Sequence, residues 1–139
     1  MVIQRKQSLF LLLAAIMMGV FCFMPIASFM VEEMTVLIEP INNPVYLVIN
    51  ILITLLLFID IFLFKNFKLQ KRVATISIVL IVLSCVMGVM LGSNNFENFN
   101  VNWCYSSAIL PLCSLILTNM ALRGIKSDEE KIKSYDRIR

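Results

Sequence analysis

Between Arg72 and Glu97 the chain reads VATISIVLIVLSCVMGVMLGSNNF (residues 73–96), which is a run of 24 residues without a charge. A helix rises about 1.5 Å per residue, so about 20 apolar residues cross the hydrocarbon core of a bilayer. Two more runs, at 7–31 and 98–122, each hold 25 uncharged residues. This pattern is typical of a polytopic membrane protein.

The composition supports the same class. The chain has 139 residues, of which 60% are hydrophobic and 15% charged, whereas a soluble domain has roughly 25% charged residues. A fourth apolar segment is interrupted by Asp60. We therefore expect residues 1–139 to form one integral membrane domain, an all-α, antiparallel four-helix transmembrane bundle. The expected helices are 8–29, 45–64, 73–91 and 105–122, followed by a cytoplasmic tail at 123–139.

The positions of the lysines and arginines predict the orientation. All twelve fall before the first helix, between the second and third, or after the fourth. Because cytoplasmic loops carry the excess of Lys and Arg, both termini are expected in the cytoplasm and the protein in the cytoplasmic, or inner, membrane. The expected partner is thus the lipid bilayer. Cations that flank apolar spans argue against a nucleic-acid patch.

The two outer loops, 30–44 and 92–104, have a β-like texture. Thr35 to Ile38 form an apolar run in one, and Phe99, Val101 and Trp103 alternate in the other. The two segments could pair as a small β-ribbon packed on the helix ends. Three aromatic residues fall at the outer level of the helices and fit an aromatic belt at the headgroups. They are Tyr46, Trp103 and Tyr105.

The C-terminal tail carries a capping box. Ser127 is followed three residues later by Glu130, a pattern that begins helices. Ile132, Tyr135 and Ile138 then recur at helical spacing among basic residues. We expect a short amphipathic C-terminal helix, which either lies along the inner leaflet or is a solvated tail.

Three separated blocks of the chain match a known pattern. They are Ile3, Gln4, Arg5, Ser8, Leu9 and Leu11 to Ala15; Phe64, Lys65, Asn66, Lys68, Leu69 and Gln70; and Ala121 to Lys126, Asp128, Glu129 and Asp136 to Arg139. In these blocks the chain resembles domain of unknown function 4293, an uncharacterised bacterial membrane family. The resemblance implies four membrane helices and supplies no reaction, ligand or site residue.

Polar residues inside the predicted spans are the functional leads, because charged and amide groups in hydrocarbon usually face a partner. Asp60, Ser77 and Asn119 each lie about 5 to 6 Å inside a cytoplasmic helix end. One hypothesis is a polar layer that holds a cation or relays a proton. The alternative is that Asp60 pairs with a nearby cation at the interface. The candidate cations are Lys65, Arg72 and Arg123.

Small residues recur at intervals of four on two predicted helices, and such ridges let another helix approach closely. The residues are Ala15 and Gly19 on the first helix, and Ser84, Gly88 and Gly92 on the third. We interpret both ridges as helix-packing positions within the bundle. The alternative is docking of a second membrane protein or of another copy.

The inventory for catalysis is poor. The chain has no histidine, and its four cysteines form no Cys-x-x-Cys pair, so no imidazole base or typical metal site is available. We expect no enzyme activity, no metal and no cofactor. The sequence favours an accessory or scaffolding component of the membrane. The alternative function is a small ion or solute conduit that uses Asp60, and an intramembrane enzyme would need a water-accessible cleft there.

Overall fold

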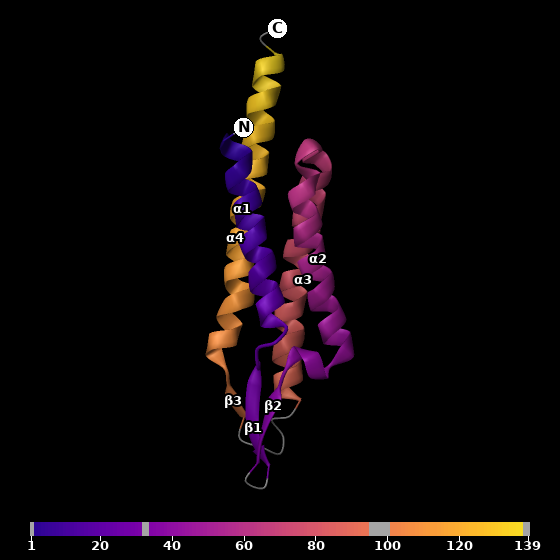
Figure 1. Cartoon of the computed structure of the whole chain (residues 1–139), viewed down its shortest axis with the longest axis vertical. Helices are drawn as coiled ribbons and strands as arrows, with labels where there is room; N and C mark the ends of the chain where they lie inside the picture. The colour runs from indigo at the N-terminus through magenta and orange to yellow at the C-terminus, as the bar shows by residue number, and fades with distance from the viewer. Residues whose placement is uncertain (1, 32–33, 95–100, 138–139) are drawn as a thin grey trace.

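A computed structural model describes residues 2–31, 34–94 and 101–137 (Figure 1). Four long helices dominate it: α1 (Val2–Phe21), α2 (Pro44–Phe62), α3 (Phe67–Ser93) and α4 (Tyr105–Asp136). Three strands and two short 3₁₀ helices connect them, namely β1 (Ala27–Val31), β2 (Met34–Ile38), β3 (Val101–Trp103), η1 (Pro40–Asn42) and η2 (Leu63–Lys65). The predicted number of helices is confirmed.

The four helices lie along the long axis of the molecule, with both termini towards one end and the sheet at the other (Figure 1). α1 packs against α2 and α4, and α3 packs against the same two helices. The connection between α2 and α3 lies towards the same end as the termini. We call that end the basic end, because the described Lys and Arg residues belong to the start of α1, to this connection and the first turns of α3, and to the second half of α4 and the residue after it. The opposite end is the sheet end.

The core of the bundle is formed by one face of each helix. Leu11, Ala14 and Met18 of α1 are fully buried at helical spacing, as are Ile53 and Leu57 of α2. The outward faces remain apolar, and many of their side chains are half exposed or more. Among the described residues, three helical segments are long and apolar enough to cross a membrane, whereas the apolar part of α1, Lys6–Phe21, is shorter. These segments are Pro44–Lys65, Phe67–Ser93 and Tyr105–Tyr135.

The predicted first helix, 8–29, is wrong at its C-terminal end, because α1 ends at Phe21. Pro25 has no amide hydrogen, and its ring would clash with the carbonyl of Phe21 in a continued helix. The amides of residues 22–24 instead donate to carbonyls three residues earlier, which closes a tight turn. The chain then enters β1, so a segment predicted as membrane helix is a strand.

A small sheet in the outer loops is confirmed, but the predicted pairing is wrong. The strand order is β2-β1-β3, and β1 is antiparallel to both neighbours. Ala27 lies opposite Ile38 on one side and Trp103 on the other. The two loop segments therefore pair with β1 instead of with each other. Phe99, part of the prediction, lies outside the described residues.

The remaining helices differ from prediction mainly at the basic end. α3 begins at Phe67 instead of Val73. The prediction followed the apolar run, and the first turns of the helix lie before that run and are charged. α4 continues without a break to Asp136, so the predicted separate helix at Ser127 is wrong. No proline interrupts the chain after Pro111, and one glycine in a helix costs only about 1 kcal/mol. Ile138, part of the predicted apolar face, lies outside the described residues.

Candidate functional site

Asp60 of α2 is completely buried, and its two carboxyl oxygens have no hydrogen-bond partner within the described part of the chain. Gln70 Nε2 of α3 donates to the backbone carbonyl oxygen of Asp60 at 3.4 Å and not to its carboxyl group. The expected ion pair with Lys65, Arg72 or Arg123 is not formed among these residues. A buried polar group without a partner is costly, so Asp60 is an anomaly in the core.

The other two members of the predicted polar layer bond within their own helices. The hydroxyl of Ser77 donates to the Val73 carbonyl at 3.0 Å. Asn119 Nδ2 donates to the Leu115 carbonyl at 3.1 Å. In these two hydrogen bonds, Ser77 and Asn119 donate to their own helices and not to the carboxyl group of Asp60. A layer that binds a cation or relays a proton stays a prediction.

A second buried polar cluster, which the sequence did not reveal, joins α2 to α3. Tyr46 Oη donates to the Ser84 carbonyl at 3.1 Å, and Ser84 Oγ donates to Asn50 Oδ1 at 2.7 Å. Asn50 Nδ2 in turn donates to the Tyr46 carbonyl at 3.0 Å. Tyr46 is only 1% exposed, so its prediction as part of an aromatic belt is wrong. The spacing of Tyr46 and Asn50 by four residues was the available signal, since it places both on one helix face.

The glycines of α3 make room for aromatic rings. A Cβ atom added at Gly88 would lie 2.8 Å from Tyr46 Oη, and one added at Gly92 would overlap the Trp103 ring. Tyr46 belongs to α2 and Trp103 to β3. At Gly88 and Gly92, an aromatic side chain therefore lies against the backbone of α3. On α1, a Cβ at Gly19 would meet Thr54 Cγ2 at 3.9 Å, which is ordinary contact, and Ala15 is buried in the core.

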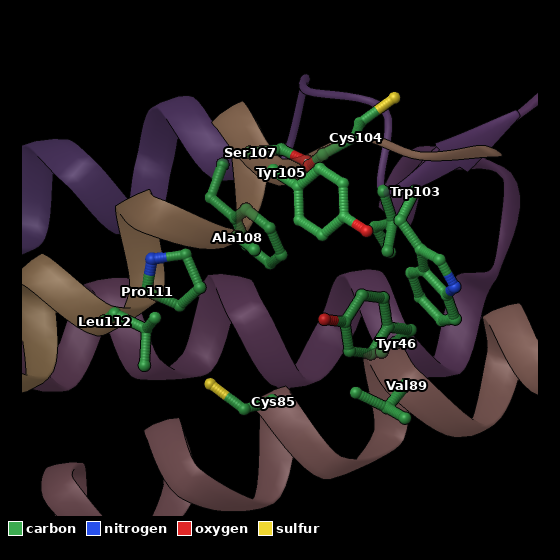
Figure 2. A pocket seen from close by; sticks show the side chains of 13 residues that line it. Tyr46, Cys85, Val89, Trp103, Cys104, Tyr105, Ser107, Ala108, Pro111 and Leu112 are labelled. Atoms are coloured by element: carbon green, nitrogen blue, oxygen red, sulfur yellow. The ribbon is translucent and has the colours of Figure 1, made fainter.

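An apolar cavity of about 280 Å³ lies between α3 and α4 at the sheet end. The rings of Tyr46, Tyr105 and Trp103 gather on one side of it, and Pro111 and Leu112 lie on the other (Figure 2). Cys85 also lines the cavity. Pockets of this size with an apolar lining are where proteins bind small apolar groups.

The basic end is held together by a charged cluster. The Gln7 side-chain amide of α1 donates to the buried carboxylate of Asp128 on α4. Glu129, the next residue, binds Lys71 of α3 and, at 3.0 Å, Lys133. The hydrogen bond from Lys71, and then that from Lys133, lowers the pKa of Glu129 below its ordinary value. The cluster therefore fixes the second half of α4 against α1 and α3.

The sequence profile of the family described as Domain of unknown function (DUF4293) matches residues 3–138. The chain belongs to this family. The resemblance seen in the three sequence blocks is thereby confirmed. Comparisons with curated proteins and with solved structures give no match. DUF4293 membership therefore carries no reaction or ligand to this chain, and function has to be argued from its own residues.

In this DUF4293 chain the described residues contain no group of three or more Cys, Asp or Glu side chains placed to hold a metal ion. Cys22, Cys85, Cys104 and Cys113 are all free thiols. The features that carry chemistry are thus the unpartnered Asp60, the apolar cavity at the sheet end and the exposed last turns of α4 after Glu129.

Proposed function

We propose that this protein is an integral protein of the cytoplasmic membrane, with four crossings and both termini in the cytoplasm. The apolar outward faces of the helices support insertion, because large apolar surfaces mark contact with lipid or protein. The gathering of described cations at the basic end supports the orientation, because cytoplasmic ends carry the excess of Lys and Arg.

The short first helix is compatible with this placement. Its apolar part, Lys6–Phe21, spans about 24 Å, compared with a hydrocarbon core of about 30 Å. Phe23 and Met24, which follow the helix, are apolar and exposed, so they extend the apolar surface towards the sheet end. Local thinning of the bilayer accommodates the remaining mismatch at modest cost.

Within the membrane, the proposed role is that of a non-enzymatic accessory or scaffolding component. The observation that carries this role is the length of α4, which runs for 32 residues or about 48 Å. It extends well beyond the other three helices at the basic end (Figure 1). Ile132 and Tyr135 are exposed on this extension. A rigid helix with exposed apolar anchors is suited to the groove of a partner protein.

The test is purification of an N-terminally tagged chain from its native membrane after brief cross-linking, with partners identified by mass spectrometry. We expect a reproducible partner that is lost when Ile132 and Tyr135 are both changed to Glu. Ser134→Glu is the matched control, because Ser134 is exposed between them and its change should keep the partner. Absence of any partner, including a second copy, or retention of it by the double variant would reject the scaffolding role.

A second candidate is a small conduit for ions or protons, which one observation favours. A buried carboxyl group without a partner is typical of intramembrane sites that bind a cation or a proton. This role requires a path to Asp60, which does not line the apolar cavity at the sheet end. If Asp60→Asn leaves both ion flux in reconstituted vesicles and cell growth unchanged, the conduit is rejected.

A further inference from the structure

We propose that the cavity between α3 and α4 at the sheet end binds a single hydrocarbon chain, namely the tail of a membrane lipid. The proposal concerns a binding site and does not depend on the scaffolding role. It uses the proposed membrane placement only to explain where the chain comes from.

The walls of the cavity are apolar and largely aromatic. Phe21 and Tyr46 form an edge-to-face pair with ring centroids 6.4 Å apart. Trp103 lies over Gly92, and Pro111 of α4 lies on the opposite side of the cavity from the Tyr46 and Trp103 rings (Figure 2). Rings packed in this way give a fixed surface against which a flexible chain gains dispersion contacts.

Two of the three hydroxyl groups in the wall, those of Tyr46 and Ser107, are already used. Tyr46 Oη donates to the Ser84 carbonyl at 3.1 Å. The Ser107 hydroxyl lies 2.6 Å from the Pro25 carbonyl and 2.8 Å from that of Cys104. A buried water needs two to four polar partners. The wall offers it chiefly the hydroxyl of Tyr105, whose side chain is exposed at the mouth, and the weakly bonding thiols of Cys85 and Cys104. The cavity therefore suits a ligand without polar groups.

The mouth of the cavity faces outward from the bundle. Val89 of α3 and Tyr105 and Leu112 of α4 line it, and each of these residues is more than half exposed. In the proposed membrane placement this face meets lipid, so the molecules that reach the mouth are hydrocarbon chains. The volume of about 280 Å³ is roughly twice that of an apolar cavity that takes up one benzene. It accommodates a segment of one chain, and the headgroup would remain outside.

Trp103 provides a direct readout, because it is the single tryptophan of the chain and lines the cavity. Bromine atoms quench indole fluorescence on contact. The protein, purified in detergent micelles, is titrated with 9,10-dibromostearate while Trp103 emission is recorded. We expect quenching that saturates at a low mole fraction and is reversed by an excess of unbrominated stearate or farnesol. Quenching that only rises in proportion to the mole fraction, or that neither competitor reverses, would overturn the proposal.

Two matched variants locate the site. Ala108→Phe fills the cavity that Ala108 lines, and we expect it to abolish the saturable part of the quenching. Val79→Phe adds the same ring to the exposed surface of α3, away from the cavity lining, and we expect the wild-type titration. Saturable quenching that survives in a folded Ala108→Phe protein would place the chain elsewhere and overturn the proposal.

A readout on the unaltered protein covers the case in which Ala108→Phe does not fold. Cys85 lines the cavity, whereas Cys113 of α4 does not. With N-phenylmaleimide as the reagent, saturating stearate should slow the labelling of Cys85 and leave Cys113 unchanged. Equal rates at Cys85 with and without stearate would overturn the proposal.

The competitors distinguish the source of the chain. Reversal by stearate alone assigns a straight acyl chain, and reversal by farnesol alone assigns a methyl-branched isoprenoid tail. All of these measurements are made in micelles without a membrane or a partner. Their failure would therefore remove the chain site without bearing on the scaffolding role or on the orientation.

Discussion

Gly92 and Gly19 differ in how much space a side chain would have at each position. Gly92→Ala should lower the free energy of unfolding by about 1–3 kcal/mol, because overpacking forces neighbouring groups to move and the added methyl overlaps the Trp103 ring. Trp103 emission should shift as the ring is displaced. Denaturant unfolding in detergent, followed by circular dichroism, measures the first effect.

Gly19→Ala is the control for this prediction. Its added methyl meets Thr54 only at van der Waals distance, and alanine gains up to about 1 kcal/mol over glycine in a helix interior. We expect unchanged or slightly raised stability. Equal losses in the two variants would mean that the ring of Trp103 does not lie against Gly92.

Asp60 allows a second prediction at the scale of the residue. Leucine branches at Cγ as aspartate does but has no polar group, and a buried polar group without a partner costs about 1–3 kcal/mol. Asp60→Leu should therefore raise the free energy of unfolding in detergent. Asp60→Asn keeps a polar group at the position and should give a smaller gain. A clear loss of stability in Asp60→Asn, which keeps the shape of the side chain, would mean that the carboxyl group makes a stabilising bond.

At the scale of the element, α4 is held at the basic end by its charged cluster. Asp128→Ala removes the carboxylate that accepts a hydrogen bond from the Gln7 side chain. Gln7 is only 4% exposed. The buried amide then lacks a partner, so we expect a loss of about 1–3 kcal/mol in the free energy of unfolding. Glu130→Ala changes the exposed neighbour and should alter stability little. Equal effects would contradict the hydrogen bond between Gln7 and Asp128.

Glu129 should make this anchoring depend on pH. Its pKa in the folded protein is lowered from 4.5 by the hydrogen bonds from Lys71 and Lys133. A lowered folded pKa stabilises the protein above the unfolded value, and this stabilisation is lost as the pH falls through the folded value. Thermal unfolding should therefore shift to lower temperature as the pH drops below 4.5. Glu129→Gln should weaken this pH dependence of the unfolding temperature, and Glu130→Gln should not. The same pH dependence in both variants would contradict the role of Glu129.

The elements differ in how far the sequence predicts them. Three uncharged runs and a fourth apolar segment around Asp60 predicted the four helices, because a membrane crossing requires a long apolar segment. Charge, however, does not mark where a helix ends. α3 and α4 continue into charged turns for this reason. β1 was missed because residues 27–29 continue a mostly apolar stretch and fit the end of a helix equally well. Pro25 was the local signal against a helix there. Without β1, the pairing of the other strands could not be derived.

The candidate site was predictable only in part, because its features depend on contacts between helices. The sequence marked Asp60 as a costly residue in an apolar span. It could not show that the carboxyl group lacks a partner, since this depends on how α2 and α3 are rotated. The cavity likewise depends on the position of Trp103 against α3, and β3, which carries Trp103, pairs with the strand β1 that the sequence did not reveal.

At the scale of the whole molecule, opposite ends of the bundle should lie on opposite sides of the membrane. The most direct measurement is labelling of single introduced cysteines by a membrane-impermeant maleimide in intact cells, in a background with the four native cysteines changed to serine. Met34→Cys reports on β2 at the sheet end, and Lys131→Cys on the extension of α4; both positions are exposed. We predict that Met34→Cys is labelled in intact cells and Lys131→Cys only after permeabilisation. Labelling of both positions from outside, or of Lys131→Cys alone, would contradict the proposed insertion.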